Sequence, residues 1–209
     1  MKHIALLTTL LLSASLQAVE KPYDYVFFEN SLMKGDYFYS QAKYTSPSWI
    51  KNARHHLPVA GSVAFTPGNS LELTYVSAPG GDWYSEIQYC PVRGNDFFRE
   101  PSTLSMQVRL RESMNAAALP NIAIRYADST YTQYLNLRNY LKDTRPGVWH
   151  SVSIPLKDFG LNAVNDTNIK KLAAVALRPG TADGNEYTIY LDDIELLPAS
   201  LPSVSALNA

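Results

Sequence analysis

Apolar and polar residues alternate at every second position in several segments, and this pattern constrains the fold more than any other feature. The segments are residues 71–75, 85–89, 104–110, 122–126, 134–138 and 152–156. Successive side chains of a β-strand point to opposite faces, so each segment predicts a strand with one buried face. Leu172–Leu177 is apolar on both faces, which is typical of a central, covered strand.

Turn residues such as Pro79-Gly80-Gly81-Asp82 separate these segments, and no amphipathic helix longer than a turn or two is predicted. The aromatic stretch from Glu29 to Val59 is expected to be irregular. Strands with a single apolar face pack as two antiparallel sheets. We therefore predict an all-β fold, a two-sheet antiparallel β-sandwich of the jelly-roll type. Its predicted core contains Leu73, Ile87, Val108, Ile124, Leu137, Ile154 and Val175.

The two ends of the chain are not expected to be part of this domain. Residues 1–18 combine a short polar start, an apolar run and a small-residue cleavage site, which predicts a signal peptide and a secreted or periplasmic protein. The apolar run is too short to cross a bilayer. Residues 198–209 are small and rich in Pro and Ser, as in a linker or the start of a following module. Residues 19–197 remain as one domain.

Charge and cysteine content narrow the classes of partner. The net charge is −1, so no basic field is available to hold a nucleic-acid backbone. Cys90 is the only cysteine, which excludes an internal disulfide. We expect an exported monomer that binds neither nucleic acid nor membrane.

An acidic pair interrupts the last predicted strand. Asp192 and Asp193 follow the strand-forming residues 187–191 and precede the largely apolar residues 194–197. A buried, unpaired carboxylate is strongly disfavoured, so something must compensate it. A hard cation bound through oxygen ligands is one compensation, and a solvated edge or a bend in the strand is the alternative. Glu29, near the other end of the domain, has a similar apolar setting.

Three segments carry a resemblance to a known family. Residues 147–159 read Gly-Val-Trp-His-Ser-Val-Ser-Ile-Pro-Leu-Lys-Asp-Phe, residues 190–196 read Tyr-Leu-Asp-Asp-Ile-Glu-Leu, and residues 28–30 read Phe-Glu-Asn. They resemble carbohydrate-binding modules with the galactose-binding-like jelly-roll fold. The resemblance implies a structural calcium ion (Ca2+) held between the first and last strands. Glu29 and one of the two adjacent aspartates would be its ligands, with backbone carbonyls completing the shell.

The same resemblance implies a glycan ligand and a place in a larger protein. Residues 201–209, Leu-Pro-Ser-Val-Ser-Ala-Leu-Asn-Ala, resemble the start of a fibronectin-type-III module. The chain would then be the N-terminal module of a secreted, glycan-degrading protein and would be tethered to further modules.

Polar side chains of the central predicted strands form a candidate binding face. Sugars are recognised by planar donors and acceptors that match vicinal hydroxyls, and by aromatic rings that stack on the apolar ring face. With the strands side by side, one face is expected to present Glu86, Gln88, Gln107, Arg109, Arg125, Tyr134, Asn136 and Arg138. The alternative is an ordinary solvated sheet face. Trp83 and Tyr84 follow a Gly-Gly turn, where they would form a stacking platform, or Trp83 would cap the core.

Catalysis is the runner-up interpretation. A jelly-roll endoglucanase needs carboxylates at alternate strand positions, and the sequence has no Glu-x-Asp-x-Glu run. A jelly-roll polysaccharide lyase needs a Tyr or His base beside Arg and Gln, but the strand motifs of that family are missing. We therefore predict a non-catalytic module that binds a polysaccharide or oligosaccharide. The alternatives are a jelly-roll polysaccharide lyase or glycoside hydrolase, and a protein-binding adhesion or structural module.

Overall fold

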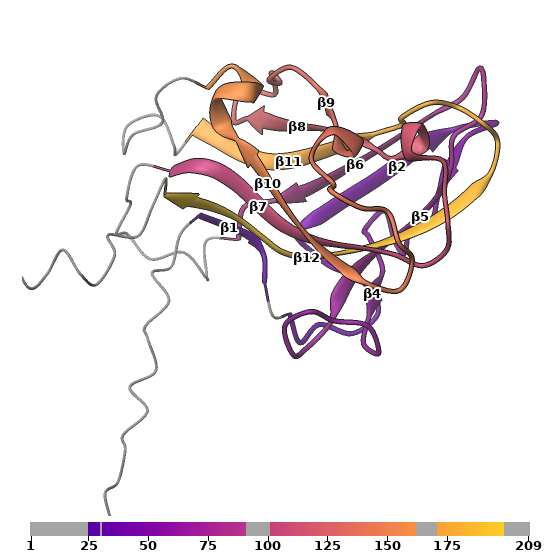
Figure 1. Ribbon diagram of the computed structural model, residues 1–209, viewed down its shortest axis with the longest axis horizontal. Coiled ribbons are helices and arrows are strands. Elements are labelled where there is room, and N and C mark those ends of the chain that lie inside the picture. Colours follow the sequence, from indigo (N-terminus) through magenta and orange to yellow (C-terminus); the bar gives the residue numbers. More distant parts are fainter. Residues whose placement is uncertain (1–24, 30, 91–100, 162–170, 199–209) are drawn as a thin grey trace, which may run out of the picture.

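The alternating segments fold as the strands of two antiparallel sheets that pack face to face (Figure 1). The computed structural model describes residues 25–29, 31–90, 101–161 and 171–198. Residues 1–18 and 199–209 lie outside these ranges, so the signal peptide and the linker stay predictions.

The larger sheet has seven strands, in the order β10-β7-β12-β5-β3, with β1 paired to β12 and β4 paired to β5. Their bounds are β1 (Tyr25–Phe28), β3 (Trp49–Ile50), β4 (Val59–Ala60), β5 (Ser70–Val76), β7 (Pro101–Leu110), β10 (Trp149–Pro155) and β12 (Glu186–Pro198).

The smaller sheet has five strands, in the order β2-β6-β11-β8-β9. They are β2 (Ser40–Thr45), β6 (Asp82–Gln88), β8 (Asn121–Tyr126), β9 (Leu135–Asn136) and β11 (Leu172–Arg178). Short 3-10 helices complete the described structure, namely η1 (Ala116–Ala118), η2 (Leu137–Asn139) and η3 (Leu156–Phe159). No helix within the described ranges is long and apolar enough to cross a membrane.

The space between the sheets holds the predicted core. Each core residue predicted from the sequence is fully buried, namely Leu73, Ile87, Val108, Ile124, Leu137, Ile154 and Val175. Full burial of one such side chain contributes roughly 1.5–3 kcal/mol to stability. The alternation therefore identified the inner faces of β5, β6, β7, β8 and β10 correctly, and the predicted sandwich is confirmed.

Two local predictions were wrong. The stretch after Glu29 is not irregular throughout, because β2 forms the edge of the five-stranded sheet within it. Only Ser40 and Ala42 of β2 are buried, so this strand lacks the apolar alternation that would have revealed it. Residues 134–138 are a strand only at β9, because the Asn136 side chain accepts a hydrogen bond from the Arg138 N–H and starts η2.

The central strand of the five-stranded sheet is β11, which lies between β6 and β8 as its apolar sequence predicted. Val175 and Leu177 belong to the core cluster between the sheets. Ala174 and Ala176 alternate with them and point to the outer face, where they are nevertheless fully buried. Side chains from the neighbouring strands must therefore cover this central strand from outside.

Candidate functional site

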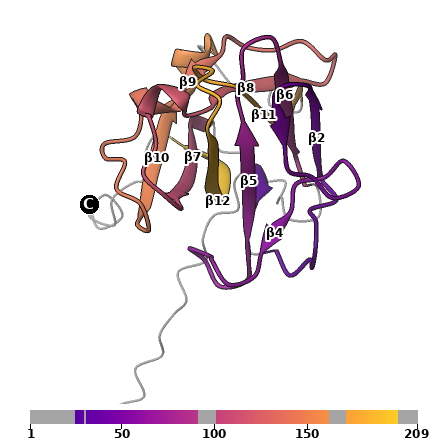
Figure 2. The same ribbon diagram turned by 90° about the vertical axis from the view of Figure 1, so that its right-hand side faces the viewer.

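A hollow of about 520 Å3 lies on the outer face of the five-stranded sheet. Strands β2, β6, β11 and β8, together with the loop after β8, line it with Gln41, Lys43, Asp82, Tyr84, Glu86, Arg125, Ser129, Tyr131 and Arg178. Figure 2 shows β2 and β6 on one side of the molecule and β10 and β7 on the other. We call this hollow the tyrosine groove.

An ion pair forms the floor of the tyrosine groove. Arg125 of β8 and Glu86 of β6 reach toward each other above the alanines of β11, and Arg125 Nε lies 2.5 Å from Glu86 Oε1. The two side chains are only 16% and 5% exposed. Because removing charges from water is costly, such a pair is stable only when both partners are present. It offers a ligand a fixed donor and a fixed acceptor.

Tyrosine hydroxyls connect the ion pair to the rim of the groove. The Tyr131 hydroxyl donates to Glu86 Oε1 at 3.3 Å and lies 3.1 Å from the Tyr84 hydroxyl. Burial and the charge of Glu86 raise the pKa of Tyr131, so its hydroxyl stays a donor at neutral pH. The Tyr131 ring stacks on that of Tyr134, with centroids 6.0 Å apart, and both side chains remain more than a third exposed. These rings are accessible to a ligand.

Arg178 holds the aromatic wall in position. Its guanidinium lies 5.3 Å from the centroid of the Tyr84 ring and 5.8 Å from that of Tyr134. Nη1 donates to Asp82 at 2.8 Å, and Nε donates to the Tyr134 hydroxyl at 3.1 Å. Cation–π contact and hydrogen bonds together restrict the rotation of both rings, which lowers the entropy lost on binding.

Part of the predicted binding face is therefore present. Glu86, Arg125 and Tyr84 line the groove, and Tyr134 contacts two of its side chains. Gln88 lies beside Glu86 on the outer face of β6, but outside the groove lining. Sequence reasoning missed the remaining lining residues, namely Gln41, Lys43, Asp82, Ser129, Tyr131 and Arg178. Of these residues only Arg178 could have been identified from the sequence, because it follows Ala174 and Ala176 at alternate positions of the strand and so points to the same outer face.

The prediction of one continuous face was wrong for three other residues, Gln107, Arg109 and Arg138. Gln107 and Arg109 belong to β7, which lies in the seven-stranded sheet and faces the opposite side of the sandwich. Asn136 does lie on the five-stranded sheet, opposite Asn121 of β8, and its amide donates to the Leu119 carbonyl and the Asn121 side chain. Arg138 lies on η2 rather than on a strand. Alternation assigns faces to a strand, but it does not say which sheet the strand joins.

Trp83 is a core residue and not a loop-rim platform. It is 1% exposed, and its ring centroid lies 4.8 Å from that of Tyr75. Its indole Nε1–H donates to Ser77 Oγ at 2.9 Å, which satisfies the polar atom of a buried tryptophan. Trp83 shares its parity with Ile87, so the core alternative was the correct one.

The comparisons with known proteins agree with the β-sandwich fold. The family described as Carbohydrate binding domain 30 matches residues 24–197. The chain belongs to this family. Over all 209 residues it is 99% identical to an exo beta-1,2-glucooligosaccharide sophorohydrolase (non-reducing end) of Parabacteroides distasonis. The chain spans 29% of that relative's length.

Solved structures support the fold of the family 30 module. A crystal structure of a beta-1,2-glucanase from Parabacteroides distasonis matches with a TM-score of 0.85 and 99% identity, over 88% of this chain and 26% of that chain. A family 30 carbohydrate-binding module of a cellulosomal cellulase of Clostridium thermocellum matches with a TM-score of 0.56 and 16% identity, over 82% of this chain and 98% of that one. The second match supports the fold alone.

The acidic pair of the module lies on the opposite sheet, at a bulge in β12. Asp192 is fully buried, and its carboxylate accepts backbone N–H bonds from Phe65 (2.8 Å), Thr66 (3.2 Å) and Asp193 (2.9 Å). Burial, aided by the charge of Asp193, raises the pKa of Asp192 to about 6. These N–H donors lower the pKa of Asp192 and so offset part of the cost of burying its charge. No residue pattern predicts that the 63–67 loop supplies these donors.

Asp193 is compensated less completely. Its Oδ2 accepts from the Thr66 hydroxyl at 2.8 Å, whereas its Oδ1 is buried without a hydrogen-bond partner. Its positive φ of 46° marks the bend that turns the strand here. Glu29 follows β1, whose Phe28 pairs with Ile194 of β12. Within the described ranges no three His, Cys, Asp or Glu side chains gather as a metal site, so carboxylates alone would not complete one.

Proposed function

We propose that this module binds a single β-glucan chain in the tyrosine groove and does not cleave it. The observation that carries the proposal is a hollow of about 520 Å3 in which exposed tyrosine rings surround a buried Glu86–Arg125 pair. Aromatic rings suit the apolar faces of glucose units, and planar donors and acceptors suit their hydroxyls. The membership in a carbohydrate-binding family supports this general function.

The groove crosses neighbouring strands, which suits an extended ligand. Strands in a sheet are about 4.8 Å apart, so β2, β6, β11 and β8 together span about 14 Å. Lys43 on β2 and Arg125 on β8 stand at the two ends of this span. Adjacent sugar units would therefore contact different strands, and short oligosaccharides would bind more weakly than longer ones.

The carboxylates of the groove support binding rather than hydrolysis. Glycosidases use a pair of carboxyl groups as acid and nucleophile, or as acid and base. Here Glu86 forms an ion pair with Arg125, and Asp82 forms one with Arg178. Because both are engaged with arginine, neither of these two carboxylates is free to act on a glycosidic bond.

The relatives suggest which glucan to test first. The 99% identical relative is a sophorohydrolase named for beta-1,2-glucooligosaccharides, so we propose a β-1,2-linked glucan as ligand. Isothermal titration with linear β-1,2-glucan should show binding, with weaker heats for β-1,3-1,4-mixed-linked glucan. An assay for reducing ends should detect no product. Absence of binding to every glucan, or release of reducing ends, would contradict the proposal.

Paired substitutions locate the site within this experiment. Tyr131→Ala removes an exposed ring of the groove. Tyr44→Ala is the control, because Tyr44 of β2 is also exposed but does not line the groove. Loss of the ring contact and loss of the hydrogen bond each weaken binding by about 0.5–1.5 kcal/mol. Together they cost roughly 1–3 kcal/mol of binding free energy. Tyr131→Ala should therefore weaken glucan binding at least fivefold, and Tyr44→Ala should leave it unchanged.

We also propose that a calcium ion stabilises the module at the β1–β12 junction. The buried, unpartnered Oδ1 of Asp193 is the atom that supports this proposal. Glu29 and backbone carbonyls of the junction would supply further oxygen ligands, which is the chemistry that calcium prefers. Asp192 is not needed as a ligand, since backbone N–H groups already occupy its oxygens.

A further inference from the structure

Arg109 lies in the middle of a row that crosses the outer face of the seven-stranded sheet. In the strand register it stands opposite Trp149 of β10 on one side and opposite Tyr190 of β12 on the other. All three side chains are half-buried. The Arg109 Nε is buried without a hydrogen-bond partner, and no ion pair joins Arg109 to a described residue. A buried polar group of this kind calls for a partner from outside.

Exposed apolar side chains continue the row at its edge. Phe65 is 49% exposed, and its ring packs edge-on against Trp149 with centroids 6.0 Å apart. Val148, the neighbour of Trp149 in sequence, is 44% exposed. Phe65 is fixed in this position because its N–H donates to Asp192. We call the surface formed by Phe65, Arg109, Val148, Trp149 and Tyr190 the Arg109 face.

The composition of the Arg109 face is that of a protein interface. The buried centres of such interfaces are enriched in Trp, Tyr, Phe and Arg, and their strongest contacts come from Trp, Tyr and Arg. A neutral glycan would leave the charge of Arg109 without a counter-charge and would gain no hydrogen bond from Phe65 or Val148. A carboxylate would accept two parallel bonds from the guanidinium. The partner that fits is a protein surface with an acidic side chain surrounded by apolar ones.

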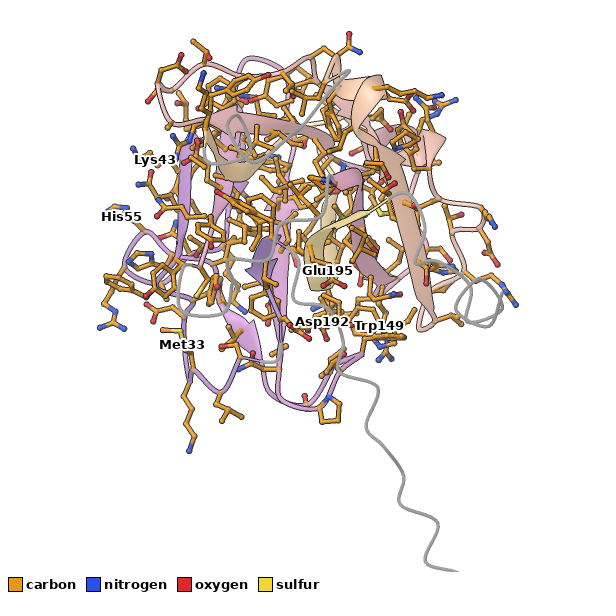
Figure 3. The ribbon with its side chains drawn as sticks, turned by 90° about the vertical axis from the view of Figure 1, so that its left-hand side faces the viewer. Met33, Lys43, His55, Trp149, Asp192 and Glu195 are labelled. Carbon is orange, nitrogen blue, oxygen red and sulfur yellow. The ribbon has the colours of Figure 1, made fainter. Side chains whose placement is uncertain are left out.

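One such partner is covalently connected to the module. The chain spans 29% of a 99% identical relative, so most of that polypeptide lies outside this structure. Phe65 contacts both Trp149 and Asp192, and Figure 3 shows Lys43 of the tyrosine groove at the opposite edge of the molecule from Trp149. Docking through the Arg109 face would therefore leave the groove open. We propose that the Arg109 face packs against the remainder of the glucanase polypeptide, which presents a carboxylate to Arg109.

Hydrogen–deuterium exchange on the free module and on the full-length polypeptide tests this proposal. In the full-length protein, amides of residues 62–69 and 146–151 should exchange about tenfold more slowly than in the free module. Residues 129–134, beside the tyrosine groove, should exchange equally in both. Equal exchange of residues 62–69 and 146–151 in the two proteins would overturn the proposal, whatever the groove binds.

Substitutions then identify the contact. Arg109→Gln in the full-length protein should return exchange of these segments to the rate of the free module, and Arg138→Gln should not. The melting temperature of the free Arg109→Gln module checks that the fold is intact. If instead β-1,2-glucan slowed exchange of residues 146–151 in the free module, the face would be a second glycan site and the docking proposal would be wrong. The wild-type comparison decides the question even if the variant fails to fold.

Discussion

Ala176 of β11 lies directly opposite Glu86 of β6, and its methyl group leaves the space through which Glu86 meets Arg125. On its other side Ala176 stands opposite Ala123 of β8. Ala176 is fully buried although it faces away from the core cluster. The ion pair thus covers the central strand, and the small residues beneath it determine the depth of the groove.

Enlarging Ala176 should close the groove. Ala176→Leu places a branched side chain where the ion pair lies, so we expect glucan binding to fall below detection in a titration. Overpacking of this kind typically costs about 1–3 kcal/mol, which a urea melt would measure. Ala182→Leu, at an exposed position after β11, is the matched control and should alter neither quantity. Unchanged binding by Ala176→Leu would place the ligand elsewhere.

Arg125 should matter for stability as well as for binding. Arg125→Ala leaves Glu86 as an unpaired carboxylate with a 5% exposed side chain, and breaking such a pair costs roughly 3–5 kcal/mol. The double variant Glu86→Leu/Arg125→Met should recover most of the unfolding free energy, because it buries no charge, but it should not recover glucan binding. A single Arg125→Ala variant that unfolds at the wild-type urea concentration would show that the pair is not buried in solution.

The core assignment predicts a severe effect from a single charge. Val108→Asp and Ile124→Asp each place a carboxylate at a fully buried position, and an isolated buried charge costs more than a typical domain's stability margin. Neither variant should show a cooperative melt by circular dichroism. Ser153→Asp, on an exposed position of β10, should melt as the wild type does. Cooperative melting of either core variant at the wild-type temperature would refute the assignment.

The inner faces of the strands could be predicted because burial leaves a period of two in the sequence. Val108 and Ile124 were assigned in this way without any knowledge of pairing. The outer faces could not be combined correctly, because a sandwich has two of them and both alternate identically. Arg109 and Arg125 look equivalent in sequence, yet they lie on different sheets. The order of strands in a sheet depends on pairing between distant segments, and the alternation within one segment does not indicate its partners.

The groove residues that were missed depend on such long-range geometry. Tyr131 lies in a loop and reaches Glu86 because a single bridge pairs it with Arg125. Arg178 ends an apolar strand, and its two partners lie on other parts of the fold, Asp82 on β6 and Tyr134 in the loop before β9. Tyr131 has no residue pattern that distinguishes it from a solvated surface, and the alternation with Ala174 and Ala176 indicates only which way Arg178 points.

Acid should weaken the ion pair between Asp36 and Arg54. Arg54 donates to Asp36 from Nη2 at 2.9 Å and from Nε at 3.1 Å, and these bonds lower the pKa of Asp36 below its ordinary value. A carboxylate whose pKa is lower in the folded state stabilises the protein above the unfolded pKa, near 4, and loses this contribution as the pH falls further. The melting temperature of Asp36→Asn should therefore lie below that of the wild type at pH 7, and the difference should shrink toward pH 3. Arg54→Gln should show the same convergence, and a difference that grows in acid would contradict the assignment.

Calcium should raise the melting temperature through Asp193 and not through Asp192. A ligand that binds only the folded state adds about 2.7 kcal/mol at a hundredfold excess over its dissociation constant. We expect this shift in the wild type when calcium replaces chelator, and a smaller one with magnesium, which demands stricter octahedral geometry.

Asp193→Asn should abolish the calcium-dependent rise in melting temperature, because Asp193 Oδ1 is the buried oxygen without a partner. Asp192→Asn should lower the melting temperature in calcium and chelator alike and keep the shift, because it disrupts the backbone N–H bonds to the 63–67 loop. A wild-type melting temperature that is the same with calcium and with chelator would show that Asp193 Oδ1 is satisfied by something other than this ion.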